Sequence, residues 1–376
     1  MEERAFWLAW SRISGVGPVL LKRLQQHFGT LADAWSANPQ ALLAIEGIGE
    51  QILLGIREGR SQLDPETLLH QHQQANPDFW TPADADYPRL LLEIPDPPPI
   101  LYYRGGVQPT ENQGLAPAIA IVGTRDPSDY GKRWTRKLSA SLAQKGFIVI
   151  SGLAEGIDTQ AHQGCLEAGA RTWAVLGTGI DVVYPSRNTG LYQQILKNGL
   201  VLSEQPAGTQ PNRVHFPRRN RIIAGLSRAT LVMEAPSKSG ALITAYLAND
   251  YGRDVYVLPG SLDNPRAIGC LGLVNRGAQI ILGEGYLLEA LGAMPQLAQV
   301  NPLQLPNVPP ELAQVFQTLV NLSQELAQES VPFDLIVQTT NLGSGFVSST
   351  LLQLELLGLV SQLPGMRYQP STSIGP

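Results

Sequence analysis

Seven short apolar runs, separated by spacers long enough to form helices, fill the middle of this 376-residue sequence. Such spacers let consecutive strands cross over and lie parallel, and these crossovers are right-handed. We therefore predict an α/β fold with a Rossmann-like, doubly wound, mainly parallel sheet. The predicted strands are residues 118–122, 147–150, 172–176, 200–202, 229–233, 255–258 and 279–282.

Glycine or a small polar residue follows several of these runs. In a doubly wound sheet the carboxyl ends of the strands meet at one edge, and ligands bind there. The sequence therefore predicts a binding edge made from Gly123-Thr124, Ser151-Gly152, Gly177-Thr178-Gly179, Ser203-Glu204 and Pro259-Gly260. The third of these segments lacks the last glycine of a dinucleotide fingerprint, so it is weak evidence for a dinucleotide.

Further domains are predicted on both sides of the sheet. Residues 13–17 and 45–49 share the form apolar-x-Gly-apolar-Gly. This is the pattern of helix-hairpin-helix modules, whose amides either hold a DNA phosphate or only turn the chain. The C-terminal residues have the helix, helix-turn-helix, hairpin order of a winged helix. The predicted domains are a helical helix-hairpin-helix-like (SAM-like) domain over 1–75, a proline-rich connection and strand over 76–117, the Rossmann-like domain over 118–292, a linker over 293–310 and a winged-helix domain over 311–370.

Composition narrows the possible partners. The net charge is -5, so any contact with nucleic acid must be a local patch rather than a basic field over the whole chain. The two cysteines, Cys165 and Cys270, are far apart in the sequence, which favours a reduced chain over a disulfide. No apolar run reaches membrane-spanning length, and residues 1–4 lack a signal-peptide pattern. We expect a cytoplasmic protein with no membrane contact.

The segment from Gln205 to Met233 supplies a local basic patch. It contains no acidic residue and carries Arg213, Arg218, Arg219, Arg221 and Arg228. Phe216 lies beside these arginines, so the segment offers cations for phosphates and a ring for stacking, which fits single-stranded nucleic acid. The alternative is a solvated basic turn that pairs with acids elsewhere in the fold.

Two other segments are predicted to bind anions. In Gly123-Thr124-Arg125 the glycine allows a tight turn after the first strand, and Arg125 either meets a phosphate or pairs with Asp126 or Asp158. Lys238-Ser239-Gly240 leads into a predicted helix but lacks the spacing of a P-loop.

Asp158 and His162 lie one helical turn apart. Such a pair either performs acid–base chemistry or caps and orders the start of a helix. The sequence offers no other convincing nucleophile or base and no spacing typical of metal ligands. We therefore predict no catalytic residue, no metal site and no cofactor.

In this order, the motifs resemble those of the DNA-processing protein A (DprA/Smf) family, over about residues 85–290. The most specific segment is Phe216–Ser227, which reads Phe-Pro-Arg-Arg-Asn-Arg-Ile-Ile-Ala-Gly-Leu-Ser. Leu271 stands where the family usually has asparagine, so that polar contact is in doubt, and the apolar side chain could lie in a subunit interface. The other matching segments are Val122–Arg125, Ser151–Asp158, Ala161-His162, Gly177–Asp181, Tyr184-Pro185, Ser203-Glu204, Glu234-Ala235, Ser239–Ala245 and Val257–Gly260.

The resemblance implies a single-stranded DNA-binding homodimer that protects incoming DNA and loads the RecA recombinase during natural transformation, without established catalytic residues. The alternative is a nucleotide hydrolase of the phosphoribohydrolase type on a related sheet. That class carries a glutamate at the helix start, and Ser239–Ala245 offers none. We predict that single-stranded DNA is bound by Gly123, Thr124, Arg125, Gly152, Phe216, Arg218, Arg219, Asn220, Arg221, Lys238, Ser239 and Gly240.

The C-terminal module has an unusual charge for a winged helix. The residues from Leu291 onward contain one basic side chain, Arg367, and five acidic side chains, which gives a net charge of −4. With one basic side chain against five acidic ones, counterion release does little to favour DNA, and net repulsion of phosphates remains. We therefore expect this module to contact protein. The five acids are Glu311, Glu325, Glu329, Asp334 and Glu355.

Overall fold

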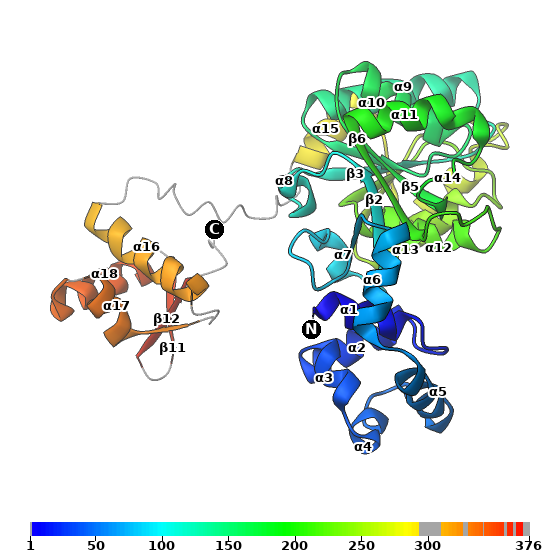
Figure 1. The fold of residues 1–376 in the computed structure, drawn as a ribbon. Coiled ribbons are helices and arrows are strands. Elements are labelled where there is room, and N and C mark those ends of the chain that lie inside the picture. The colour runs from blue at the N-terminus through cyan, green and yellow to red at the C-terminus, as the bar shows by residue number, and fades with distance from the viewer. Residues whose placement is uncertain are drawn as a thin grey trace. The chain divides into compact units, whose positions relative to one another are not determined.

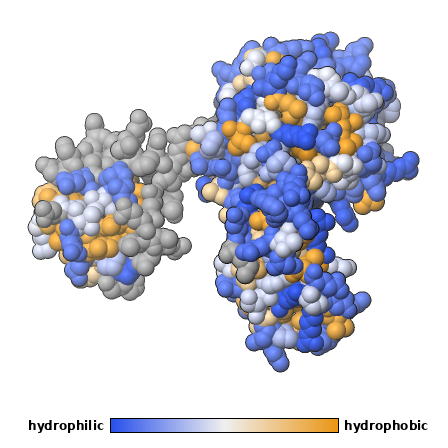
Figure 2. Space-filling model, viewed as in Figure 1, coloured by the Kyte–Doolittle hydropathy of each residue, from blue (hydrophilic) through white to orange (hydrophobic). Residues whose placement is uncertain are grey.

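The computed structural model describes residues 2–292, 310–325, 330–340, 342–356, 359–363 and 366–370. The chain forms two compact units, Met1–Leu297 and Ala298–Pro376. The first unit contains the helices coloured blue in Figure 1 and the sheet coloured from cyan to yellow. Hydrophilic residues cover most of its visible face, with small hydrophobic patches between them (Figure 2).

A nine-stranded sheet in the order β1-β2-β6-β5-β4-β3-β7-β8-β9 organises the first unit. The β1–β2 and β2–β6 pairs are antiparallel, and every pair from β6 to β9 is parallel. All seven predicted runs form strands, which confirms the predicted fold class. The strands are β1 (Phe79–Trp80), β2 (Leu101–Gly105), β3 (Ala118–Val122), β4 (Ile148–Ser151), β5 (Thr172–Gly179), β6 (Gly199–Gln205), β7 (Ala229–Val232), β8 (Asp254–Val257) and β9 (Gln279–Ile280).

Helices cover both faces of the sheet (Figure 1). Alternate residues of β3 belong to different buried clusters, as the two-residue period of a strand requires. Ala120 shares a cluster with Ile222 of α12, and Ile121 shares one with Leu138 of α9. One face carries α9 (Asp129–Gln144), α10 (Ile157–Glu167), α11 (Thr189–Asn198) and α15 (Glu284–Gly292). The other carries α7 (Arg89–Glu93), α12 (His215–Gly225), α13 (Ala241–Asp250) and α14 (Ile268–Val274).

Six helices precede the sheet and contain two similar hairpins. The α1–α2 and α4–α5 turns pass through Gly15 and Gly47, whose φ angles of 82° and 96° suit glycine. Gly17 and Gly49 then occupy the N-cap positions of α2 and α5. The helices are α1 (Glu3–Ser11), α2 (Pro18–Phe28), α3 (Leu31–Ser36), α4 (Pro39–Leu43), α5 (Glu50–Gln62) and α6 (Pro65–Ala75).

Two of these helices, α1 and α6, share a core with the sheet. Leu8 of α1 and Leu69 of α6 belong to the same buried cluster as Phe79 of β1 and Tyr102 of β2. The predicted boundary near residue 75 lies between α6 and β1, which share this cluster, whereas α2 to α5 contribute to a separate buried cluster. The connection that follows contains α8 (Pro109–Asn112), and a short 3₁₀ helix, Ser186–Asn188, precedes α11.

The second unit has three helices and a three-stranded sheet in the order β10-β12-β11 among its described residues. Val315, Ile336, Val347 and Leu351 are buried in its core. The element order is the one predicted for a winged helix. The elements are α16 (Pro310–Glu325), β10 (Val331–Pro332), α17 (Phe333–Thr340), α18 (Ser344–Leu356), β11 (Val360–Leu363) and β12 (Arg367–Pro370).

Candidate nucleic-acid interface

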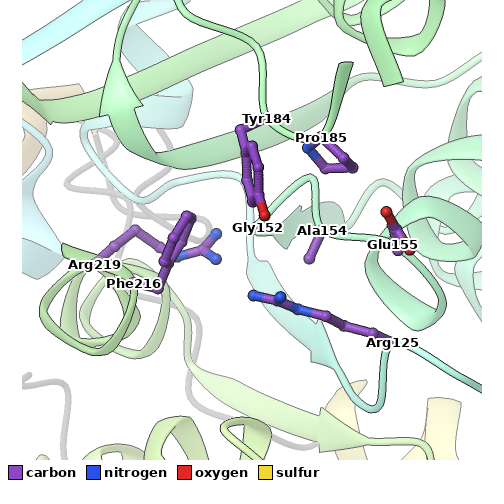
Figure 3. A pocket seen from close by; sticks show the side chains of 8 residues that line it. All are labelled: Arg125, Gly152, Ala154, Glu155, Tyr184, Pro185, Phe216 and Arg219. Carbon is purple, nitrogen blue, oxygen red and sulfur yellow. The ribbon is translucent and has the colours of Figure 1, made fainter. Parts of the chain in front are cut away.

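A small pocket of about 60 Å³ opens at the carboxyl edge of the sheet (Figure 3). Loops after β3, β4 and β5 form three of its sides, and the first turn of α12 forms the fourth. The guanidinium group of Arg125 points across the opening toward Phe216 (Figure 3). The lining residues are Arg125, Gly152, Ala154, Glu155, Tyr184, Pro185, Phe216 and Arg219.

The arginine cluster lies on helix α12, whose 3.6-residue period distributes the side chains around the axis. Arg218 is exposed to solvent, whereas Arg219 and Arg221 are only 7% and 8% exposed. Arg218 therefore faces solvent, whereas Arg219 and Arg221 face the protein interior, and each arginine has different contacts.

Arg219 forms part of the pocket floor. Its Nη1 donates to the carbonyl of Val175 at 2.5 Å, while Nε has no hydrogen-bond partner among the described residues. A Cβ atom at position 152 would lie 1.8 Å from this Nη1, so only glycine fits there. The Gly152 N–H donates to Asp158 at 3.0 Å. Gly152 thus makes room for the buried guanidinium, and its amide already has a partner within the protein.

Arg221 is held by acids. Its guanidinium pairs with Glu204, and its Nε lies 3.2 Å from Asp96, which also accepts a hydrogen bond from Tyr251. Burial raises the pKa of Glu204, and the charge of Arg221 opposes that shift. The alternative of pairing with distant acids therefore describes this residue. Arg221 joins the 76–117 connection to the sheet and has no solvent-facing position from which to contact DNA.

Phe216 is half-buried beside Arg125. Its ring lies 5.5 Å from that of Tyr184, and the Arg125 guanidinium carbon lies 5.7 Å from its centroid. A Cβ at position 177 would lie 2.8 Å from the same ring, so Gly177 lets Phe216 pack against β5. Arg125 is exposed and has no acidic partner within 4 Å in the described part of the chain.

The start of α9 is occupied by the protein's own carboxylate. Buried Glu234, which follows β7, accepts hydrogen bonds from Ser128 N–H at 2.8 Å and Ser128 Oγ at 2.6 Å. The Thr124 N–H donates to the carbonyl of Glu234 at 2.7 Å. A Cβ at Gly123 would meet Ile157 at 2.5 Å, so this glycine serves close packing. The turn around Gly123 and Thr124 therefore offers Arg125 to a ligand, while the Thr124 N–H is engaged within the protein.

Lys238, Ser239 and Gly240 lie near α12. The Asn220 amide donates to the carbonyl of Gly240 at 3.2 Å, which joins α12 to the start of α13. Ser239 Oγ accepts from the Ala241 N–H at 3.3 Å. Lys238 is exposed and has no acidic partner within 4 Å among the described residues.

Asp158 and His162 have separate partners. Asp158 accepts from the N–H groups of Gly152 and Ala154, and burial raises its pKa against the opposing charge of Arg219. His162 Nδ1 lies 2.8 Å from Thr172 Oγ1, and burial lowers its pKa to about 3. These contacts match the helix-ordering alternative.

Sequence reasoning missed Tyr184, Pro185 and Glu155 as pocket residues. Tyr184 and Pro185 appeared only within the family motif, and Glu155 pairs with Arg187 at 3.1 Å. Within the described ranges, no cluster of three His, Cys, Asp or Glu side chains could hold a metal ion. No helix in those ranges has the length and apolar character needed to cross a membrane.

The fold and its edge define an α/β protein with a cation-lined pocket, joined to a winged helix. A family model described as DNA recombination-mediator protein A matches residues 78–292, and the DprA winged helix domain matches residues 304–366. The chain belongs to the DprA/Smf family of DNA-processing proteins.

Similar proteins cover most of the chain. Protein Smf of Synechocystis is 52% identical over 98% of each chain. The crystal structure of DprA from Streptococcus pneumoniae matches 77% of this chain and 98% of that one, at 35% identity and a TM-score of 0.65. A structure of DNA processing protein A from Helicobacter pylori, which concerns its single-stranded DNA binding mode, covers 57% of this chain and 95% of its own, at 31% identity and a TM-score of 0.51.

We predict that Arg221→Met lowers the free energy of unfolding by about 3–5 kcal/mol, because it leaves Glu204 and Asp96 without their buried counter-charge. The exposed Arg218→Met is the matched control and should change it by less than about 0.5 kcal/mol. Urea denaturation of both variants measures the difference. Equal stability of the two would show that the buried ion pairs do not hold α12.

We also predict a pH effect from His162. Its folded pKa of about 3 lies below the ordinary 6.5, so only the unfolded state takes up a proton between these values. Stability is therefore lost as the pH falls through this window, by up to roughly 1.4 kcal/mol per pH unit. His162→Gln should remove this part of the dependence. Denaturation curves between pH 7.5 and pH 5 test it, and parallel profiles for both proteins would contradict it.

Proposed function

We propose that this chain binds single-stranded DNA along the carboxyl edge of its sheet. The observation that carries the proposal is a set of three exposed cations at this edge. Arg125 lies beside the half-buried ring of Phe216, Arg218 lies on the first turn of α12, and Lys238 precedes α13, whose start is hydrogen-bonded to α12. None has an acidic partner within 4 Å in the described ranges. Cations that track a backbone beside a ring that can stack on a base are the recurrent elements of single-strand sites.

The twelve predicted residues divide into five roles under this proposal. Arg125, Arg218 and Lys238 meet phosphates, and Phe216 contacts a base. Arg219, Gly152, Gly123 and Thr124 set the shape of the pocket, while Asn220, Ser239 and Gly240 hold α12 beside α13. Arg221 holds α12 in place through its ion pairs with Glu204 and Asp96. The similar Helicobacter pylori protein has a single-stranded DNA binding mode, which supports the same ligand here.

We infer that the cellular role is to protect incoming DNA and to load RecA recombinase on it during natural transformation, in the cytoplasm. Family membership supports this role. Binding without catalysis is favoured over nucleotide hydrolysis because Asp158 and His162, the one acid–base candidate of the sequence, are engaged in buried structural contacts.

The protein is proposed to act as a homodimer. Several large apolar side chains near β9 and α14 are exposed, among them Leu262 at 78% and Leu282 at 72%. Ile268, Ile280 and Tyr286 are exposed in the same part of the chain. Exposed apolar side chains of this density are typical of association surfaces.

We predict that Arg125→Glu and Arg218→Glu each weaken binding to oligo-dT and lower the slope of log affinity against log salt by about 0.7 per lost phosphate contact. Phe216→Ala should cost roughly 1–3 kcal/mol through lost stacking. Lys145→Glu, an exposed charge reversal at the end of α9 that precedes β4, is the control. Unchanged affinity and slope for the Arg125 and Arg218 variants would overturn the site.

The second unit offers little to DNA. Its one basic residue, Arg367, donates to the Ser330 carbonyl at 2.6 Å and to Ser330 Oγ at 2.9 Å. The presumed recognition helix, α18, exposes Phe346 at 44% and Leu352 at 57% and carries no lysine or arginine. We infer that this module contacts protein.

We predict that a chain ending at Leu297 binds single-stranded oligonucleotides within about tenfold of the full-length affinity, because removing a module with net negative charge removes no phosphate contact. Fluorescence anisotropy on both proteins measures this, with sedimentation to compare their association states. A larger loss in a truncated protein that stays folded and associated would show that the winged helix holds DNA.

A further inference from the structure

Helix α9 carries a stripe of alternating aromatic and basic side chains, in which Tyr130, Arg133 and Lys137 are exposed and Trp134 is half-buried. Tyr130, Arg133, Trp134 and Lys137 have the spacing of one helical face. The Arg133 guanidinium carbon lies 5.9 Å from the Tyr130 ring centroid, and Lys137 Nζ lies 5.2 Å from that of Trp134. The two rings are 6.4 Å apart. We call these four residues the α9 stripe.

The α9 stripe begins at the same edge of the sheet as the pocket. Tyr130 follows Arg125 by five residues, and its hydroxyl donates to the carbonyl of Pro259 at 3.2 Å, just beyond β8. The pocket lies at the ends of β4 and β5. Because β4, β3, β7 and β8 are consecutive neighbours, three strand spacings, or about 14 Å, separate the two places along the edge. Arg125 lies between them, after β3.

One cation of this part of α9, Arg133, is left available to a polyanion. Residues 126–137 contain four basic and two acidic side chains. Asp126 pairs with Arg266 at 2.5 Å, and Asp129 pairs with Lys132 at 3.2 Å, so both acids are compensated. Arg136 pairs with Glu167 at 3.5 Å, and Lys137 pairs with Glu284 at 2.9 Å. Arg133 is exposed and has no acidic partner within 4 Å among the described residues, so its charge is available to a ligand.

We propose that the α9 stripe is a second subsite for the same single strand, in which bases stack on Tyr130 and Trp134 and a phosphate meets Arg133. This inference rests on the proposed function. Stacking requires the face of an unpaired base, which a duplex does not offer, so the ligand is single-stranded. Tyr130 is 37% exposed, which leaves ring surface for a base. Continuity with Arg125 along one edge lets one strand reach both places.

Oligonucleotide length separates the two subsites. A chain of about four nucleotides occupies the pocket alone, whereas one of about sixteen can reach both, within the known range of site sizes. The variant Tyr130→Ala/Arg133→Glu should bind the long oligo-dT roughly five- to a hundredfold more weakly and show a salt slope lower by about 0.7. Its affinity for the short oligo-dT should stay within about twofold.

Trp134 supplies a second readout, because a base that stacks on its ring should quench its fluorescence. The ring is partly buried against the core. The long oligo-dT should quench tryptophan fluorescence in the wild-type protein, and the conservative Trp134→Phe should reduce the quenching. Lys145→Glu, a charge reversal at the far end of the same helix, is the control and should bind both lengths normally.

Each outcome decides between the two proposals. Unchanged long-oligo affinity in the double variant, while Arg125→Glu still loses the short oligo, would overturn the second subsite and leave the proposed function standing. Equal weakening for both lengths, or an equal effect of Lys145→Glu, would also overturn it, because the stripe would then act only through overall charge or folding. An Arg125→Glu variant that binds the short oligo normally would instead remove the proposed function.

Discussion

The buried charges of helix α12 fix the geometry on which the binding edge depends. A guanidinium removed from water is tolerated only with compensating partners, and breaking such a pair is costly. Arg221 finds Glu204 and Asp96, which fastens α12 both to β6 and to the connection before β3. Arg219 reaches the carbonyl of Val175 and fills the space that a side chain at Gly152 would need. With α12 held on these two sides, Phe216 and Arg218 are left at its first turn, facing the edge.

The position of the pocket follows from a competition between anions. In an open α/β sheet the usual ligand site lies at the switch point, here between β3 and β7. Glu234 already occupies that place and satisfies the N–H of Ser128 at the start of α9. A phosphate would meet a buried carboxylate there. Arg125 after β3 and Arg133 on α9 are among the exposed cations that remain available in the described ranges, so under the proposed function a bound strand would pass beside Glu234.

Much of the fold could be predicted because each buried strand is a run of consecutive apolar residues. The runs in β3 to β8 are apolar on both faces, as a sheet covered by helices requires. The two-residue strand β1 was not predicted, since its pairing with β2 is a tertiary contact. The sequence predicts the arginine segment to be one basic patch. In the structure, the helical period of α12 places Arg219 and Arg221 on its buried side. The ion pairs of Arg221 with Glu204 and Asp96 cannot be predicted from local sequence. The same holds for the hydrogen bond between Ser128 and Glu234, which are 106 positions apart in the sequence.

Under the proposed function, the charge balance of the chain favours single strands over duplex. A chain with a net charge of -5 lacks the broad basic field that gives non-specific affinity for duplex phosphates. A few unpaired cations at one edge supply only modest phosphate attraction, so stacking must contribute a large share of the binding free energy. Stacking is available only to unpaired bases. Under the proposed function, the low overall charge and the aromatic rings beside Arg125 and Arg133 therefore act together. Additional basic charge across the surface would strengthen binding to duplex and so reduce the preference for single strands that the rings provide.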